Sequence, residues 1–177
     1  MEWKDLVTQN FDSTLGVLEL TLKGLNQADL NWQPKSDCNS IGWTTWHVSR
    51  FLDMGFSTLT GEEQLWIKDG WCEKFSRPAD PADTGGRNTP DQVAAFMSPA
   101  PDTLIGYYRA VLEKAQNYLI TLNSPDFDRK IDDRFSHVLP NVGSRIIRTL
   151  PELHQHLGQI AYIRGLLQGH GWVESIR

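Results

Sequence analysis

The chain has 177 residues, which suits a single domain spanning residues 1–177. Hydrophobic residues make up 40% and charged residues 22%, a balance that indicates a folded globular protein and excludes a disordered one. The net charge of −5 excludes the broad basic surface that a nucleic-acid partner would require.

The cysteines and the first residues indicate where the protein resides. Cys38 and Cys72 are the two cysteines, and their spacing matches no disulfide framework, zinc motif or redox motif. Residues 1–5 open in charged sequence without the apolar stretch of a signal peptide. No run approaches the roughly 18 apolar residues that a membrane span requires. We therefore expect a cytoplasmic protein with no membrane partner.

The first two helices are predicted from apolar residues that recur every three to five positions. The first helix is expected over residues 3–23, and a single helical turn follows at residues 26–32. The second helix is expected over residues 39–59, with Asn39 or Ser40 as its N-cap. Both long segments present one apolar face, as the helices of a bundle do.

A long connection, residues 60–101, separates the second helix from the third. Its glycines and prolines predict a decorated loop with one short helix at residues 92–97. Periodicity predicts the last two helices over residues 102–122 and 142–167, with a small extended excursion at residues 127–135. The expected fold is all-α: an antiparallel four-helix bundle with a long crossover between helices two and three.

The last helix contains residues suited to bind a metal ion. Glu152 and His156 lie one turn apart and about 40° apart around the helix axis, so that both can reach one ion. The alternative is an ordinary exposed pair at i,i+4 spacing. His154 lies about 200° from Glu152, which predicts a solvated surface residue. Pro151 can kink the helix, and His154 would replace Glu152 as the ligand if the helix is rotated there.

A third ligand is available on the second helix. His47 shares a face with the apolar side chains of Trp43, Phe51 and Met54, and we expect it to point into the bundle. The alternative is a core histidine that is hydrogen-bonded to a neighbour. Two imidazoles and one carboxylate suit zinc or nickel above all, with iron and manganese as alternatives, and leave coordination positions open.

These motifs resemble those of the DinB-like metal-binding family, which includes relatives of the mycothiol-dependent maleylpyruvate isomerase and the bacillithiol transferases. Residues 39–47, Asn-Ser-Ile-Gly-Trp-Thr-Thr-Trp-His, are similar to the second-helix motif of that family. Residues 152–159, Glu-Leu-His-Gln-His-Leu-Gly-Gln, are similar to its last-helix motif. The resemblance covers nearly the whole chain. It implies a triad of His47, Glu152 and His156, in the His-Glu-His form of the isomerase-like branch.

The resemblance also implies a function. A metal-dependent transferase or isomerase that acts with a low-molecular-weight thiol is expected, because a coordinated thiol ionises at neutral pH. The competing hypothesis is a metal-stabilised structural or ligand-binding protein without turnover. An open coordination position beside an aromatic cavity would favour the enzyme, and a closed fourth ligand would favour the alternative. A homodimer is the oligomeric state that the resemblance implies.

Further residues are expected around the metal ion and its small-molecule substrate. Arg164 or Arg50 is expected to receive an anionic group of the substrate. Asp53 lies about 120° off the face of His47, so it is expected to be a solvated charge and not a general base. The expected pocket walls are Trp43, Trp46, Tyr107 and Gln159.

Overall fold

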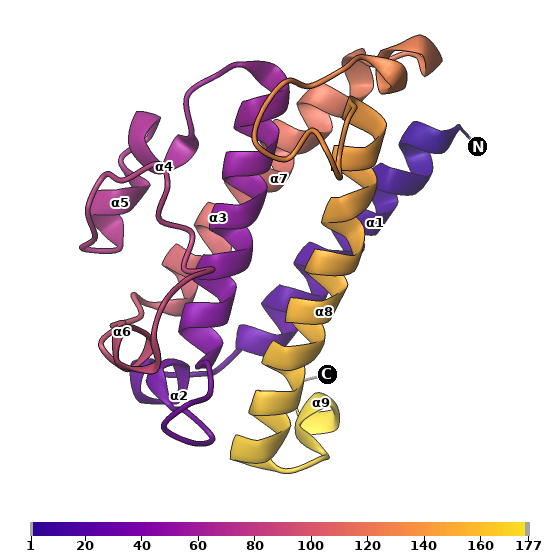
Figure 1. Cartoon of the computed structure of the whole chain (residues 1–177). Coiled ribbons are helices and arrows are strands. Elements are labelled where there is room, and N and C mark those ends of the chain that lie inside the picture. The colour runs from indigo at the N-terminus through magenta and orange to yellow at the C-terminus, as the bar shows by residue number, and fades with distance from the viewer. Residues whose placement is uncertain (1, 176–177) are drawn as a thin grey trace.

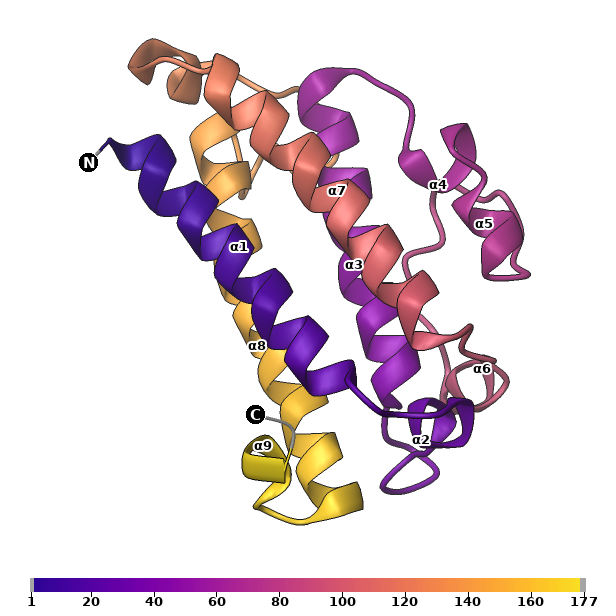
Figure 2. The ribbon, with the colours of Figure 1, turned by 180° about the vertical axis from the view of Figure 1, so that it is seen from behind.

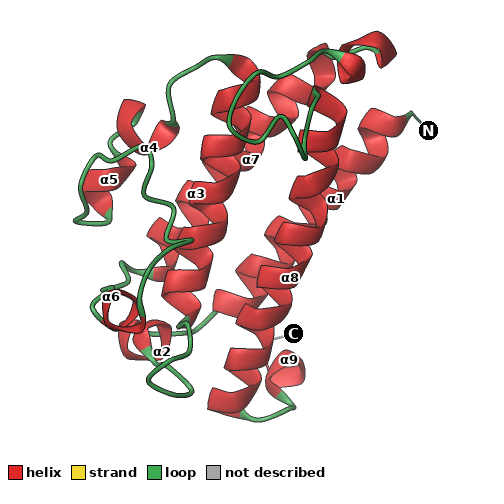
Figure 3. Cartoon of the chain, in the orientation of Figure 1, coloured by secondary structure: helices red, strands yellow, loops and turns green. Residues whose placement is uncertain are grey.

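The computed structural model describes residues 2–175, and its regular structure is helical (Figures 1 and 3). One isolated bridge, between Lys130 and Asn141, is the exception within this range. The all-α prediction is therefore confirmed. The long helices are α1 (Trp3–Leu22), α3 (Ile41–Thr60), α7 (Pro101–Thr121) and α8 (Val142–Gln168).

The four long helices form a bundle in which each packs against two others. Helices α1 and α3 both contact α7 and α8. Helices α1 and α8 run in one direction and α3 and α7 in the other, as the two opposite views show (Figures 1 and 2). The shared direction of α3 and α7 requires the long crossover that the sequence predicts between them. The antiparallel pair α3 and α8 is the one that carries the candidate ligands.

Side-chain caps define where the two ligand-bearing helices begin. Ser40 caps α3, because its hydroxyl accepts a hydrogen bond from the backbone amide of Trp43 at 3.2 Å. Asn141 caps α8 in the same way, through the amide of Ser144 at 2.9 Å. Of the two N-caps expected for the second helix, Asn39 and Ser40, the structure uses Ser40. The two caps fix the residue at which each ligand-bearing helix begins.

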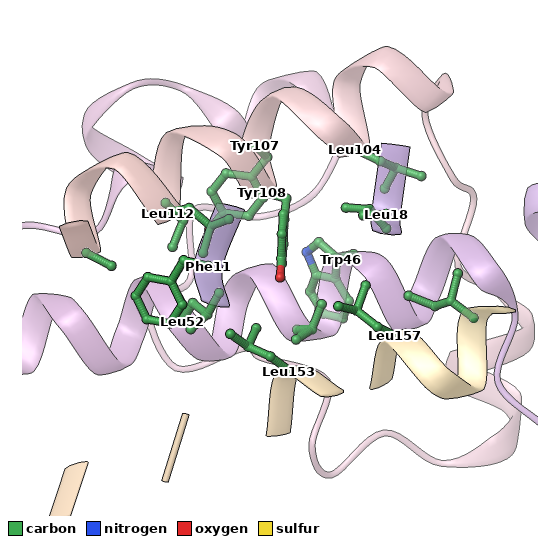
Figure 4. Packing of buried hydrophobic residues seen from close by; sticks show 14 of the residues in the cluster. Phe11, Leu18, Trp46, Leu52, Leu104, Tyr107, Tyr108, Leu112, Leu153 and Leu157 are labelled. Atoms are coloured by element: carbon green, nitrogen blue, oxygen red, sulfur yellow. The ribbon is translucent and has the colours of Figure 1, made fainter. Parts of the chain in front are cut away.

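The core lies between the long helices, and each of the four contributes to it (Figure 4). Phe11, Leu52 and Leu153 are fully buried there, and Leu112 is 2% exposed. No helix among the described residues is long and apolar enough to span a membrane.

The long crossover contains three short helices, where one was expected. They lie beside α3, on the side away from α8 (Figure 1). The expected helix at residues 92–97 begins two residues earlier, because Thr89 accepts a hydrogen bond from the amide of Gln92 and caps it. The aromatic rings of Trp66, Phe75 and Phe96 are buried against the bundle. The short helices are α4 (Leu65–Lys68), α5 (Trp71–Lys74) and α6 (Pro90–Ala94).

Asp53 is a fully buried carboxylate that fixes the start of the crossover, and the expectation of a solvated charge was wrong. Its oxygens accept hydrogen bonds from the backbone amides of Leu65 and Trp66 at 3.0 and 2.8 Å. Its partner on α7 is Tyr107, whose hydroxyl donates to Asp53 at 2.8 Å. Burial raises the pKa of Tyr107 well above its usual value, so the phenol remains a donor.

Arg50 holds the later part of the crossover. Its guanidinium donates to the backbone carbonyls of Asp80, Pro81 and Asp83 at 3.0–3.2 Å. It also lies 3.6 Å from the carboxylate of Asp53, and it has no exposed surface. Arg50 therefore binds the chain itself, and its donors are not available to the anionic substrate group that was expected there.

The remaining segments differ from expectation near the two ends of α8. Of the small extended excursion expected at residues 127–135, one bridge at Lys130 forms, and a 3₁₀ turn, Ser124–Asp128, takes up its first two residues. The asparagine and aspartate at positions 123 and 126 form a capping box that favours this turn.

Beyond α8, the chain forms the short helix α9 (Trp172–Ser175), which the glycines around it did not indicate. The turn after the first helix is α2 (Gln27–Asn31).

Candidate metal centre

His47 of α3 lies against Glu152 and His156 of α8. One nitrogen or oxygen of each side chain lies within 4.8 Å of one from each of the other two. The two imidazole rings are 4.8 Å apart at their centroids and inclined at 87°. Glu152 Oε1 is 3.2 Å from His156 Nε2. The structure therefore brings together the three residues that the sequence singled out, because antiparallel packing of α3 on α8 places their faces opposite each other.

The hydrogen bonds of the two imidazoles determine which nitrogen is free. His47 Nδ1 contacts the backbone carbonyl of Thr84, and His156 Nδ1 lies 2.8 Å from the amide oxygen of Gln159. Since both oxygens only accept hydrogen bonds, each Nδ1 carries the proton. Each Nε2 then presents a lone pair, which is the arrangement that metal-bound histidines show in proteins.

A cation would satisfy this arrangement. The lone pair of His156 Nε2 faces the carboxylate of Glu152, and two acceptors in contact repel each other unless a positive charge lies between them. A proton on His156 or a metal ion shared with His47 supplies that charge. The donor set, two nitrogens and one carboxylate oxygen, is one that binds divalent transition metals and leaves coordination positions open.

The electrostatics keep two of the three side chains in the form that binds a metal. When no metal ion is bound and His156 Nε2 carries a proton, its hydrogen bond to the carboxylate, followed by the ion pair with Arg148, lowers the pKa of Glu152 to about 2. Glu152 is therefore a carboxylate throughout the physiological range. Burial lowers the pKa of His47, which favours its neutral imidazole.

Trp43 and the crossover cover His47. The indole of Trp43 stacks on the imidazole, with ring centroids 5.0 Å apart and planes inclined by 15°, and its N–H donates to Asn88 at 3.1 Å. Gly85, with φ of +80°, lies directly over the two indoles: an added Cβ would be 2.7 Å from Trp46 and 2.8 Å from Trp43. A residue with a left-handed backbone and no side chain is required at this point.

Two of the expected pocket walls serve the packing of the crossover instead. Trp46 and Tyr107 have no exposed surface, so neither can present a face to a substrate. Trp46 packs against Trp66 and Phe96 of the crossover, and Tyr107 packs against Trp66. Gln159 is exposed and acts on His156 through its hydrogen bond. Of the expected walls, Trp43 and Gln159 are the two that contact the triad.

Arg164 also lies away from the triad. It is eight residues beyond His156, or about 12 Å along the helix axis. Its Nη1 donates to the carbonyls of Leu20 and Thr21, which lie in the last turn of α1 and have no amide partner within that helix. Its guanidinium also stacks over Trp172 at 4.7 Å. Arg164 therefore joins the end of α1 to α8 and is not placed to receive a substrate near the metal ligands.

His154 does not replace Glu152. Helix α8 continues through Pro151, and His154 is exposed on a different face, where it contacts the amide of Asn10 on α1. The prediction that His154 is a surface residue is therefore confirmed. Glu152 remains the candidate ligand, because the helix is not rotated at Pro151 in a way that would turn His154 toward His47.

A cavity beside the triad was missed by the sequence analysis. It has a volume of about 620 Å³ and lies between α3, the first half of α8 and residues 133–139. Arg148 lines it and also contacts the triad, with Nη1 2.6 Å from Glu152 Oε2. Phe135 and Val138 face the cavity and are exposed apolar residues, and their presence in a surface loop was the signal that the sequence offered.

The fold and the site define an all-α bundle with a candidate metal site built from side chains of two facing helices. The family model described as the DinB superfamily matches residues 10–160, and the chain belongs to that superfamily. The structure is similar to the crystal structure of a conserved protein of locus from Enterococcus faecalis, with a TM-score of 0.85 and 26% sequence identity. That similarity covers 96% of this chain and 99% of the other. A search of curated proteins found no match.

Proposed function

We propose that this chain is an enzyme that binds a divalent metal ion on His47, Glu152 and His156 and uses it with a low-molecular-weight thiol. The observation that carries the proposal is the orientation of the two imidazoles. Because Thr84 and Gln159 each accept a hydrogen bond from an Nδ1–H, both Nε2 lone pairs and the Glu152 carboxylate are left to share one cation. The reaction is a transfer or an isomerisation.

The metal ion, when bound, would lower the pKa of a coordinated thiol and hold it as a thiolate at neutral pH. The residues of the chain would orient and protect that site. Trp43 excludes water from one face of His47, and the buried imidazoles are held by their outer hydrogen bonds. Zinc and nickel suit the donors best, with iron and manganese as alternatives.

The competing function is a metal-stabilised structural or ligand-binding protein without turnover. The cavity that adjoins Glu152 through Arg148 favours the enzyme over a purely structural protein, because a structural site needs no space for a small molecule. A cytoplasmic location and a homodimer stay predictions from the sequence and from the resemblance to the family.

The first test is elemental analysis of protein purified without a metal-affinity tag. We expect about one divalent ion per chain in the wild type and its loss in His47→Ala and His156→Ala, because each removes one of only three protein ligands. His154→Ala is the matched control and should retain the metal, since His154 is exposed and apart from the triad. Circular dichroism would confirm that all variants are folded.

Two outcomes separate the hypotheses. Wild-type protein that stays free of metal after incubation with zinc, nickel, iron and manganese would overturn the proposed site. Stoichiometric metal without consumption of any low-molecular-weight thiol, measured with a thiol-reactive dye in the presence of an electrophile, would favour the structural alternative.

The hydrogen bond from His156 to Gln159 gives a second, finer prediction. Gln159→Leu should weaken zinc binding by about 10- to 100-fold, because the imidazole loses the acceptor that fixes its orientation and tautomer. Competition with a chromophoric zinc chelator measures the change. Gln155→Leu, at an exposed position on the same helix, is the control and should bind zinc as the wild type does. Equal affinities of the two variants would contradict the role assigned to Gln159.

A further inference from the structure

The cavity beside the triad has the size and composition of a small-molecule site. Its volume of about 620 Å³ falls in the usual range for ligand pockets, about 300–1,000 Å³. Its wall on α3 includes Gly55, where an added Cβ would meet no heavy atom within 4 Å. The apolar side chains of the lining are Phe51, Met54, Leu59, Phe135, Val138 and Leu139.

The loop that closes the cavity holds apolar side chains at its opening. Val138 is 61% exposed and Phe135 is 38% exposed, although both lie on the lining. The loop is nevertheless fixed: Arg145 Nε donates to the carbonyl of Leu139 at 2.8 Å, and its guanidinium pairs with Asp133. A fixed wall with exposed apolar side chains offers a preformed surface that a bound molecule would remove from water.

The charges on the lining favour an anion at the end nearest the triad. The carboxylate of Asp133 is the acidic group on the lining, and Arg145 neutralises it. Arg134 stacks on Phe135 at 4.6 Å. Arg148 remains, with 46% of its side chain exposed, between the cavity and Glu152. A metal ion on the triad would take up the charge of Glu152, which leaves Arg148 as a cation directed at the cavity.

We propose that this cavity binds the substrate of the enzyme, and that the substrate is an apolar molecule with one anionic group that pairs with Arg148. The assignment rests on the proposed metal-dependent function, because it places the substrate beside the triad. The apolar body lies against Phe51, Val138 and Leu139, and the anionic group lies at Arg148, one helical turn before Glu152. Arg148 thereby becomes the residue that selects the charge of the substrate.

Titration calorimetry with three probes that share one apolar body tests the assignment: 6-phenylhexanoate, 6-phenylhexan-1-ol and 6-phenylhexylammonium. The metal-loaded wild type should bind the carboxylate at least about ten-fold more tightly than the alcohol, and the ammonium most weakly, because a charge-assisted hydrogen bond to Arg148 is gained or lost. Arg148→Gln should abolish the preference for the carboxylate over the alcohol. A preference that survives in this variant would overturn the role of Arg148.

Two further variants test the cavity itself. Gly55→Leu should weaken binding of all three probes about ten-fold or more, since the new side chain occupies the space of the ligand without meeting the protein. Gly16→Leu on α1 is the matched control, an exposed helical glycine with no heavy atom within 4 Å of its added Cβ. Val138→Glu, at an exposed position that cannot disturb the core, should weaken the carboxylate selectively by placing a like charge at the opening.

The metal content of the same samples separates the two proposals. Absence of metal from the wild type would overturn the proposed function, whatever the probes do. Stoichiometric metal together with no binding of the carboxylate, or with binding that Gly55→Leu leaves unchanged, would overturn the cavity assignment and leave the metal site standing.

Discussion

Replacing Asp53 by alanine is expected to lower the free energy of unfolding by about 3–5 kcal/mol. The carboxylate is the anionic partner of Arg50, which is fully buried, and of Lys114, whose side chain is 8% exposed. Its removal leaves buried positive charge uncompensated and takes the acceptor from the amides of Leu65 and Trp66. Urea denaturation followed by circular dichroism measures the change.

An ion pair at the surface provides the comparison. Glu19 pairs with Arg109, and both side chains are more than 40% exposed. Glu19→Ala should therefore change the stability by no more than about 1 kcal/mol. If the Asp53 variant were as stable as the Glu19 variant, the buried network would not be what holds the crossover on the bundle.

Replacing Gly85 by alanine is expected to weaken zinc binding by about 10- to 100-fold. The new Cβ would lie within 3 Å of ring carbons of Trp43 and Trp46, and φ of +80° is strained for alanine. The loop must move, and it carries the carbonyl of Thr84 away from His47 Nδ1. Competition with a chromophoric chelator reports the affinity, and circular dichroism reports the fold.

The neighbouring glycine supplies a matched control. A Cβ added at Gly86 would lie 3.7 Å from the hydroxyl of Thr84 and 3.9 Å from His47 Cε1, which are ordinary contacts. Gly86→Ala should keep the zinc affinity of the wild type. An equal loss of zinc affinity in the two variants would show that any added methyl group in this loop weakens binding. The role assigned to the close contact between Gly85 and Trp43 would then be contradicted.

The bundle and the shared face of Glu152 and His156 could be predicted because both depend on local periodicity. Apolar spacing identified the four long helices, and 100° per residue placed Glu152 and His156 on one face. The apolar face of the second helix left open whether His47 is a core histidine, and the resemblance to the DinB-like family singled it out as the third ligand. The antiparallel packing of α3 on α8 then brought the two faces together, which is the common geometry of sites in helical bundles.

The surroundings of the triad could not be predicted in the same way. The groups of the crossover that Arg50 and Asp53 bind are backbone amides and carbonyls, which are present along the whole chain and leave no pattern in the sequence. An aspartate off the apolar face of a helix is normally solvated, so the local rule gave the wrong answer for Asp53. The cavity depends on where residues 133–139 lie over two helices, and the path of such a loop is set by contacts distant in sequence.

Pro151 divides α8 into two parts, which contact different features of the molecule. The first part lines the cavity, and the second carries Glu152 and His156. A proline has no amide hydrogen, so the carbonyl four residues earlier receives no helical hydrogen bond. Helix α8 therefore bends most easily at Pro151. The helix therefore lacks one backbone hydrogen bond between the part that lines the cavity and the part that carries the candidate metal ligands.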